Sequence, residues 1–274
     1  MHGSRYGRCA RVSASSASST MPRLMSGGRH DEREVAEECP VALVYDGTTV
    51  AVLMATPADL TDLALGFSLT EGLIDDIGEI EDCSVVPGRD GIELRMWLRP
   101  NAGRRLKARR RHLVGPTGCG LCGIETLREA NRISRPVQRQ LGLSAGQIGL
   151  AVDALTASQV LGRATRATHA AGFFQPGSGD MIVREDVGRH NALDKLAGAL
   201  AVNGVSGRAG AIILTSRISV EMVQKTAAIG SGFIVAISAP TALAIRTAEA
   251  SGITLVGIAR GGEFEVFSHL DAIV

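Results

Sequence analysis

Short β-branched runs and longer helical patterns follow one another regularly in the last third of the chain. The pattern predicts a helix beginning at Asn191, strands at 211–215, 233–238 and 253–258, helices at 220–229 and 241–250, and a final strand at 265–267. Strands that alternate with helices in this way are usually parallel neighbours in one sheet. We therefore expect a layered α/β sheet.

Residues 124–190 add the remaining elements of this predicted domain, which spans 124–274. Apolar positions recur at helical spacing over 124–133 and 147–163. Two short β-branched or aromatic runs at 167–174 and 181–185 flank the turn sequence Gln175-Pro-Gly-Ser-Gly. These patterns predict two helices followed by two strands.

Residues 36–112 predict a smaller α+β lobe. Asp46-Gly47 separates the runs 41–45 and 49–54 and is a strong hairpin signal. Thr56 followed by Pro57 predicts the N-cap and first residue of a helix that continues toward Leu73. Strict alternation over 92–98 predicts a strand of a second hairpin with one buried face.

The first 35 residues are rich in Arg and Ser and contain no continuous apolar segment, so we expect a disordered extension and no signal peptide. The five cysteines form no even, closely spaced framework of the secreted type, which favours a reducing cytoplasm. The longest nearly apolar stretch, 232–245, is shorter than the ~20 residues that a membrane helix needs.

Charge and aromatic content narrow the class of partner. The chain has 29 Lys and Arg against 28 Asp and Glu, and only 3% aromatic residues. A nucleic-acid-binding protein usually has a basic surface and aromatic side chains that stack on bases. We therefore expect no nucleic-acid partner, and any polyanion site has to be local.

Cys119-Gly-Leu-Cys122 lies among several glycines, directly after a basic run over 104–111. We expect the basic run to be a loop and residues 113–123 to be a mobile loop that presents both sulfur atoms. Nearby cations favour the thiolate, which is the form that attacks sulfur. The alternative is half of a zinc site, but a closed site needs four ligands and no second pair follows at short spacing. We expect no structural metal.

The run Arg184-Glu-Asp-Val-Gly-Arg-His-Asn-Ala-Leu-Asp-Lys195 is dense in charge around a glycine turn that leads into a helix. Such a segment can be an ordinary solvent-facing helix with salt bridges. It can also bind an anion through backbone amides and guanidinium groups.

Three polar segments follow the predicted strands of the α/β sheet: 215–219, 238–241 and 258–263. Ligands of open α/β sheets usually bind at the carboxyl ends of the strands, so these segments should face one crevice. Helix capping by Ser219 and by Ser238 or Thr241 is the simpler alternative, and the two interpretations are compatible.

Taken together, these motifs resemble the FdhD family, the formate dehydrogenase accessory sulfurtransferases, over most of the chain after about Cys39. The resemblance is carried by the segments 119–123, 168–171, 184–195, 216–219 with Glu221 and Lys225, 238–244 and 252–257. The run 184–195 is the most specific of these. The family's fold resembles that of cytidine deaminases without their zinc site.

The resemblance implies a sulfur carrier that takes persulfide sulfur from a cysteine desulfurase. It would pass this sulfur to the molybdenum or tungsten bis-guanine-dinucleotide cofactor, its substrate, for the formate dehydrogenase catalytic subunit. Cys119 would carry the persulfide and Cys122 would assist. Similar proteins are homodimers. The residues expected at the guanine-dinucleotide are His169, Arg189, His190, Asn191, Asp194, Lys195, Ser216, Arg217, Ser238, Thr241, Ile258, Ala259, Arg260, Gly261, Gly262 and Glu263.

A second function class stays open on the sequence alone. The chain could be a non-catalytic chaperone that binds the cofactor or the apo-dehydrogenase, with incidental cysteines. Replacing Cys119 would then leave formate dehydrogenase activity intact.

Overall fold

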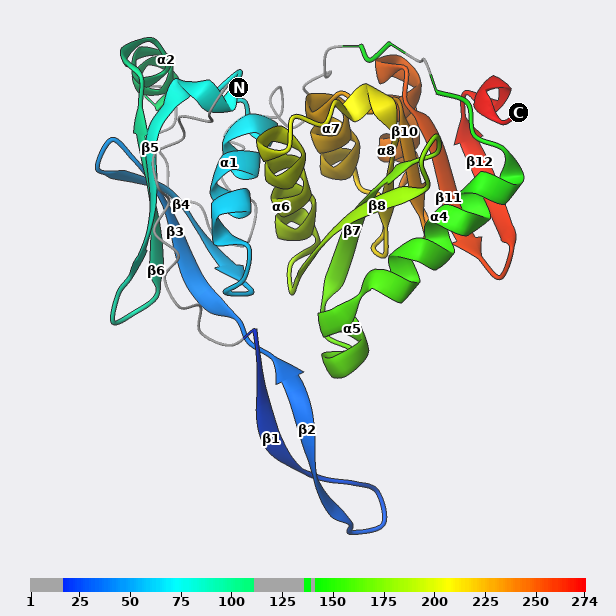
Figure 1. Ribbon diagram of the computed structural model, residues 1–274, viewed down its shortest axis with the longest axis horizontal. Coiled ribbons are helices and arrows are strands. Elements are labelled where there is room, and N and C mark those ends of the chain that lie inside the picture. The colour runs from blue at the N-terminus through cyan, green and yellow to red at the C-terminus, as the bar shows by residue number, and fades with distance from the viewer. Residues whose placement is uncertain (1–16, 111–135, 139–140) are drawn as a thin grey trace.

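A computed structural model describes residues 17–110, 136–138 and 141–274 of the chain. Two sheets organise it (Figure 1). One has four strands in the order β4-β3-β6-β5, and the other has six strands in the order β12-β11-β10-β9-β7-β8. The predicted mixed α/β class is confirmed, and the closer likeness to cytidine deaminases stays a prediction.

The first lobe is the four-stranded sheet with helices α1 and α2. Its apolar positions face α1, and its core includes Leu43, Leu63, Phe67 and Met96. The elements are β3 (Cys39–Tyr45), β4 (Thr48–Ala55), α1 (Leu60–Thr70), the 3-10 turn Ile77–Glu79, β5 (Ile80–Pro87), β6 (Ile92–Leu98) and α2 (Pro100–Arg110). Both predicted hairpins are confirmed.

The six-stranded sheet lies between two layers of helices (Figure 1), with α4 on one face and α6, α7 and α8 on the other. Alternate strand residues face opposite sides, so Ile212 packs under α6 and α7, whereas Ile213 faces α4. The elements are α4 (Ala145–Ser158), α5 (Val160–Thr165), β7 (His169–Gln175), β8 (Asp180–Asp186), α6 (Arg189–Val202), the 3-10 turn Gly207–Ala209, β9 (Ala211–Leu214), α7 (Val220–Ile229), β10 (Phe233–Ala236), α8 (Ala242–Ser251), β11 (Thr254–Arg260), β12 (Glu263–Ser268) and the 3-10 turn Leu270–Ala272.

The predicted parallel arrangement of the sheet is confirmed only for its three inner strands, β9, β10 and β11. Strands β9, β10 and β11 are parallel, whereas β7, β8 and β12 join antiparallel to their neighbours. The single helix expected over 147–163 is divided at Gln159, whose backbone is extended, into α4 and α5. The helix expected over 124–133 lies outside the described residues.

Three expectations for the residues up to 110 are wrong. Strands β1 (Ser18–Leu24) and β2 (His30–Ala36) form a hairpin that extends from the body (Figure 1), so residues 18–35 are not disordered. The basic run up to residue 110 is helix α2, because Ala102 and Leu106 provide a buried stripe. Helix α1 has Asp59 at its N-cap, three residues after the predicted Thr56.

The two lobes meet where α1 crosses α6. A Cβ atom added to Gly66 would overlap the backbone carbonyl of Asp194, and one added to Gly198 would overlap that of Asp62. Glycine at both positions therefore lets the two helix backbones touch. Among the described residues, no helix is long and apolar enough to span a membrane.

Candidate functional site

One edge of the six-stranded sheet collects most of the predicted site residues. The carboxyl ends of β9, β10 and β11 meet there with the first residue of β7, His169. The connecting segments contact one another, because the amide of Ile218 donates to the carbonyl of Ala239 at 3.3 Å and the amide of Ile258 donates to that of Ser238 at 3.2 Å. Helices α6, α7 and α8 all begin at this edge, so their first-turn amides point toward it.

Several polar residues of this edge also have local structural roles. The hydroxyl of Thr241 accepts a hydrogen bond from the amide of Ala244 at 3.2 Å and caps α8. The buried hydroxyl of Ser216 donates to the carbonyl of Arg217 at 3.1 Å, while the Arg217 side chain is exposed. The capping interpretation is thus correct for Thr241.

The segment 258–263 is the turn between β11 and β12. Gly261 and Gly262 have φ angles of 64° and 84°, which glycine adopts without steric cost, and they let Arg260 pair with Glu263. Ile258 also has a positive φ, 54°, at a register shift in the strand pair. A β-branched residue rarely adopts this conformation, and such backbone strain is most often found at functional sites. Ala259, which lies between Ile258 and Arg260, is buried.

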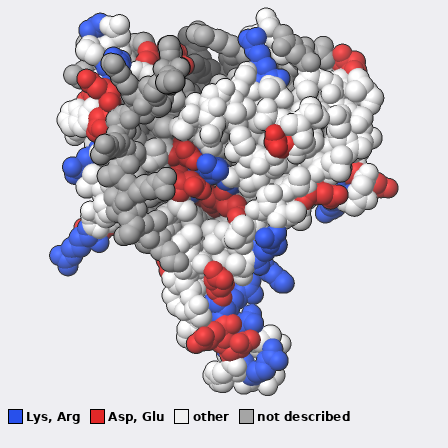
Figure 2. Space-filling model, in the orientation of Figure 1, with Lys and Arg blue, Asp and Glu red and all other residues white. Residues whose placement is uncertain are grey.

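Charged residues at the end of β8 point alternately to opposite sides. Arg184 donates to Asp62 of α1 at 2.7 Å. The carboxylate of Glu185 turns away from α1 and accepts hydrogen bonds from the amides of Leu161 and Gly162, at 2.8 and 2.7 Å. Arg184 and Glu185 therefore stabilise the fold through these contacts. Acidic and basic side chains also gather between the lobes on the face drawn in Figure 2.

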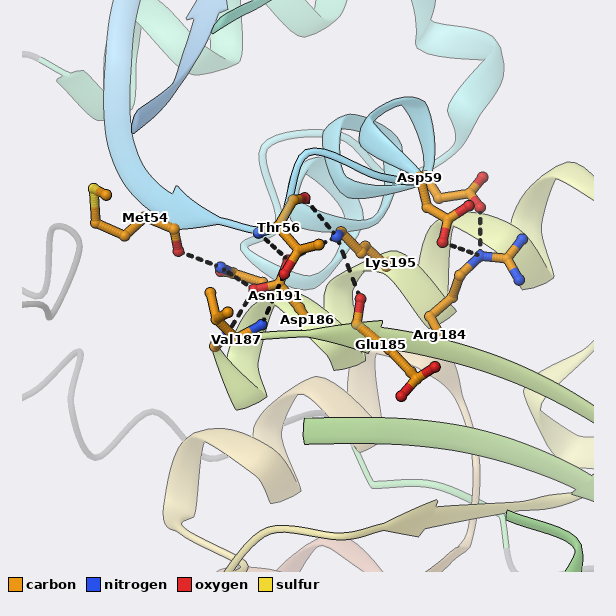
Figure 3. A network of polar contacts seen from close by, with 11 residues as sticks. Met54, Thr56, Asp59, Arg184, Glu185, Asp186, Val187, Asn191 and Lys195 are labelled. Atoms are coloured by element: carbon orange, nitrogen blue, oxygen red, sulfur yellow. Dashed lines mark hydrogen bonds and ion pairs between the residues drawn. The ribbon is translucent and has the colours of Figure 1, made fainter. Parts of the chain in front are cut away.

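Asp186 is the centre of a buried network that joins the lobes (Figure 3). Its carboxylate accepts hydrogen bonds from the amides of Thr56 and Gly188 at 3.0 and 2.8 Å and from Asn191 at 3.0 Å. It also forms an ion pair with Lys195 at 2.6 Å, in which both side chains are fully buried. This network fixes the glycine turn before α6.

A second buried network includes Asp194, the residue of α6 that directly precedes Lys195. Lys225 of α7 contacts Asp194 at 2.8 Å and Glu71 at 2.7 Å, and Thr70 donates to Asp194 at 2.6 Å. Burial lowers the pKa of Lys225, but the charges of Asp194 and Glu71 outweigh it and raise that pKa above its ordinary value. Lys225 is therefore a cation that holds α1, α6 and α7 together.

These contacts divide the run 184–195 into two groups. Asn191, Asp194 and Lys195 have internal partners and are buried, so their polar groups hold the protein together. In contrast, Nε of Arg189 and Nε2 of His190 are buried without a hydrogen-bond partner in the described structure. Of these five residues, only Arg189 and His190 have side-chain nitrogen atoms left for a ligand.

The two histidines of the site are neutral near pH 7. Burial, followed by the charge of Arg189, lowers the pKa of His190 to about 4. The same two causes, in the same order, lower the pKa of His169. The positive charge of Arg189 therefore disfavours protonation of both imidazoles.

Glu221 is a member of this cluster that the sequence-based site prediction omits. It lies in the first turn of α7, where burial raises its pKa. Hydrogen bonds in that turn and the nearby His190 and Arg189 outweigh burial, so the pKa of Glu221 lies below its ordinary value. The sequence feature that could have indicated Glu221 is its position two residues after Ser219, in a polar segment that follows a buried strand.

The predicted catalytic cysteines, Cys119 and Cys122, lie outside the described residues. The cysteines that the structure describes, Cys39 and Cys83, are half-buried in the first lobe. Burial raises the pKa of the Cys39 thiol, and the negative charge of Asp186 adds to this. No three metal-ligating side chains converge within the part of the chain that the structure describes.

Comparisons with known proteins place these features in a family. Residues 36–274 match the model of the FdhD/NarQ family. The chain is 52% identical over 244 residues to the sulfur carrier protein FdhD of Agrobacterium fabrum, covering 89% of this chain and 90% of the relative. It is 50% identical over 251 residues to the protein of the same name from Brucella abortus, covering 91% and 93%.

A solved structure shares the fold. A protein from Desulfotalea psychrophila, assigned as a formate dehydrogenase accessory protein, superimposes with a TM-score of 0.73 at 24% identity. The match covers 94% of this chain and all of that one.

Proposed function

The chain belongs to the FdhD/NarQ family and carries sulfur as its named relatives do, and we propose that it moves this sulfur from a cysteine desulfurase to a guanine-dinucleotide molybdenum or tungsten cofactor. The predicted family and sulfur-carrier role are confirmed by the relatives. The observation that carries the proposal is the pair Cys119 and Cys122 in a chain that is half identical to sulfur carrier proteins over nine-tenths of its length.

Loading of the carrier is a thiol exchange. The Cys119 thiolate attacks the outer sulfur of the desulfurase persulfide, forming a new S–S bond, and the desulfurase cysteine leaves as a thiolate. The basic run before the pair includes Arg109, Arg110 and Arg111, and its charge favours the attacking thiolate. Cys119 then carries one sulfur atom as a persulfide.

Release needs two electrons, which the second cysteine supplies. Cys122 attacks Sγ of Cys119 as a thiolate, the outer sulfur leaves as hydrosulfide, and a Cys119–Cys122 disulfide remains. The sulfide then becomes available to the cofactor, which is the substrate. A cellular thiol reductant restores both cysteines for the next cycle.

The acceptor would bind at the edge where α6, α7 and α8 begin. First-turn amides and the side chains of Arg189, Arg217 and Arg260 suit the phosphates of a dinucleotide. His169, Ser216, Ser238 and the segment 258–263 lie at the same edge. A formate dehydrogenase catalytic subunit would receive the loaded cofactor, and we propose a cytoplasmic homodimer as the working state.

Mass spectrometry tests the transfer. The full chain is incubated with a cysteine desulfurase and cysteine, and peptides are examined for the mass of one added sulfur atom. We expect it on Cys119, and Cys119→Ser should abolish it, whereas Cys39→Ser should not. Lack of the adduct in the unaltered chain, or cellular formate dehydrogenase activity unaffected by Cys119→Ser, would favour a non-catalytic cofactor-binding role.

A further inference from the structure

The described helices of the first lobe, α1 and α2, pack into the core on one side of the four-stranded sheet, and α1 is seen beside that side in Figure 1. Met96 of β6 belongs to this core. Because side chains alternate along a strand, its neighbours Arg95 and Trp97 point to the other side, which we call the outer face. Antiparallel sheets commonly turn one face to water, and such a face normally bears polar side chains.

The outer face is instead apolar along its β4 edge. Val52 and Met54 of β4 are 58% and 49% exposed. Their partners on β3 are Ala42 and Pro40, which are also apolar. Trp97, the only tryptophan of the chain, is 50% exposed on the same face. Exposed apolar patches mark interaction sites, and tryptophan is enriched among the residues that dominate protein–protein binding. The outer face therefore has the composition of a protein interface.

The charges on the outer face indicate the kind of protein that fits it. Arg95 forms a half-exposed ion pair with Glu93 of the same strand at 2.7 Å. One cation beside one anion leaves no strong positive charge, so the face does not suit a nucleic acid or an anionic membrane. Such a pair is complementary to itself, because a two-fold axis can place Arg95 of one copy opposite Glu93 of the other. A second copy of this chain meets this requirement.

The β1–β2 hairpin, here called the arm, is continuous with this sheet, since only Glu37 and Glu38 separate it from β3. A two-stranded hairpin alone is at most marginally stable in water. The arm is tied to α5 by Arg33, which donates to the carbonyl of Thr165 at 2.9 Å. Its apolar side chains, by contrast, are exposed, as Figure 1 suggests for a hairpin that extends from the body: Met21 is 48% and Leu24 66% exposed. Contacts with a second copy would cover them.

The areas of these two surfaces match the needs of a dimer. Four strands of about seven residues, ~4.8 Å apart with a rise of ~3.3 Å per residue, cover roughly 440 Å². Two such faces together bury only about 900 Å², which is less than the roughly 1,200 Å² of a stable interface. One side of each arm adds about 220 Å² by the same spacing. Sheet and arm together supply about 1,300 Å² from the two copies, which lies within the range of specific interfaces.

We propose that the outer face and the arm form the contact between two copies of this chain. Each copy packs Val52, Met54 and Trp97 against the same face of the other, and the arms extend this contact. The inference rests on the homodimer of the proposed function and names the surface that forms it. It requires nothing of Cys119, so dimer formation and sulfur loading can fail independently.

The single tryptophan allows a direct test on the full chain. Sedimentation velocity gives the mass, and acrylamide quenching of Trp97 fluorescence is measured on the same samples. We expect a dimer in which Trp97 is shielded from acrylamide. Val52→Glu places an unpaired charge in the contact, so self-association should weaken at least about tenfold and quenching should rise several-fold. Leu24→Glu leaves the sheet unaltered and should also weaken self-association.

Leu150→Glu is the matched control, because Leu150 is an aliphatic residue of α4 that is 63% exposed in the other lobe. It should leave mass and quenching unchanged, and thermal unfolding checks that all variants fold. The proposal is overturned if the unaltered chain sediments as a monomer, if its dimer leaves Trp97 as accessible to acrylamide as in the urea-unfolded chain, or if both Val52→Glu and Leu24→Glu leave self-association unchanged. Persulfide formation on Cys119 in the same samples tests the proposed sulfur transfer separately.

Discussion

The glycine contact between α1 and α6 allows a sharp test of how the lobes are joined. In Gly66→Ala the new methyl group would lie 2.7 Å from the amide nitrogen of Gly198, where ordinary contacts begin at 3.4 Å. The helices would therefore have to separate by at least about 0.7 Å, the difference between these distances. Overpacking costs about 1–3 kcal/mol. We expect the upper end, because backbone atoms obstruct the methyl group and the Asp194–Lys225 pair lies beside it.

The assay is urea unfolding of the full chain, followed by circular dichroism, with Gly149→Ala as the matched control. Gly149 lies inside α4 with nothing near its hypothetical Cβ, so alanine there should stabilise the protein by up to about 1 kcal/mol. Gly66→Ala should instead lower the free energy of unfolding by about 3 kcal/mol. Equal stability of the two variants would refute the close helix contact.

Three further predictions concern single side chains. Lys195→Met should lower the free energy of unfolding by about 3–5 kcal/mol because it leaves the buried Asp186 charge without its cation, and the double variant with Asp186→Asn should recover part of this in urea unfolding. Failure to recover would contradict an electrostatic cause. His190, with a pKa lowered to about 4, remains neutral in the folded state while the unfolded chain takes up a proton near pH 6.5, so its contribution to stability falls as the pH drops from 6.5 to 4. His190→Gln should reduce that acid-induced loss by roughly 2–3 kcal/mol, and an unchanged pH profile would argue against a buried imidazole. Cys39, whose thiol pKa is raised by burial, should react with iodoacetamide at pH 8 several-fold more slowly than a free cysteine, and an equal rate would contradict its placement.

The fold was predictable where the pattern is local. Val220–Ile229 is a helix with the predicted bounds, because its apolar stripe and the glycine after it are complete signals. The hairpin β1–β2 was missed because its strands are polar and mostly exposed, so no apolar alternation marks it. Thr56 and Pro57 mimic a helix start, but tertiary contacts use Thr56 to bind Asp186 and Val187 instead.

The candidate site was predictable as a region and less so residue by residue. Charge density in 184–195 correctly indicates an unusual segment, but it does not show which residues face the first lobe. That depends on α1, more than a hundred residues earlier, which supplies partners for Arg184 and Asp194. Glu221 was missed because its importance depends on α6 and α7 beginning side by side.

The long separation between α1 and α6 has a consequence for synthesis of the chain. About 120 residues lie between the end of α1 at Thr70 and the start of α6 at Arg189. At ribosomal speeds of about 5–20 residues per second, the first lobe would wait roughly 6–24 s for the helix that covers Gly66. During this interval Gly66 and Asp62 of α1 stay exposed to solvent and accessible to chaperones. The two lobes can therefore pack together only late in synthesis of the chain.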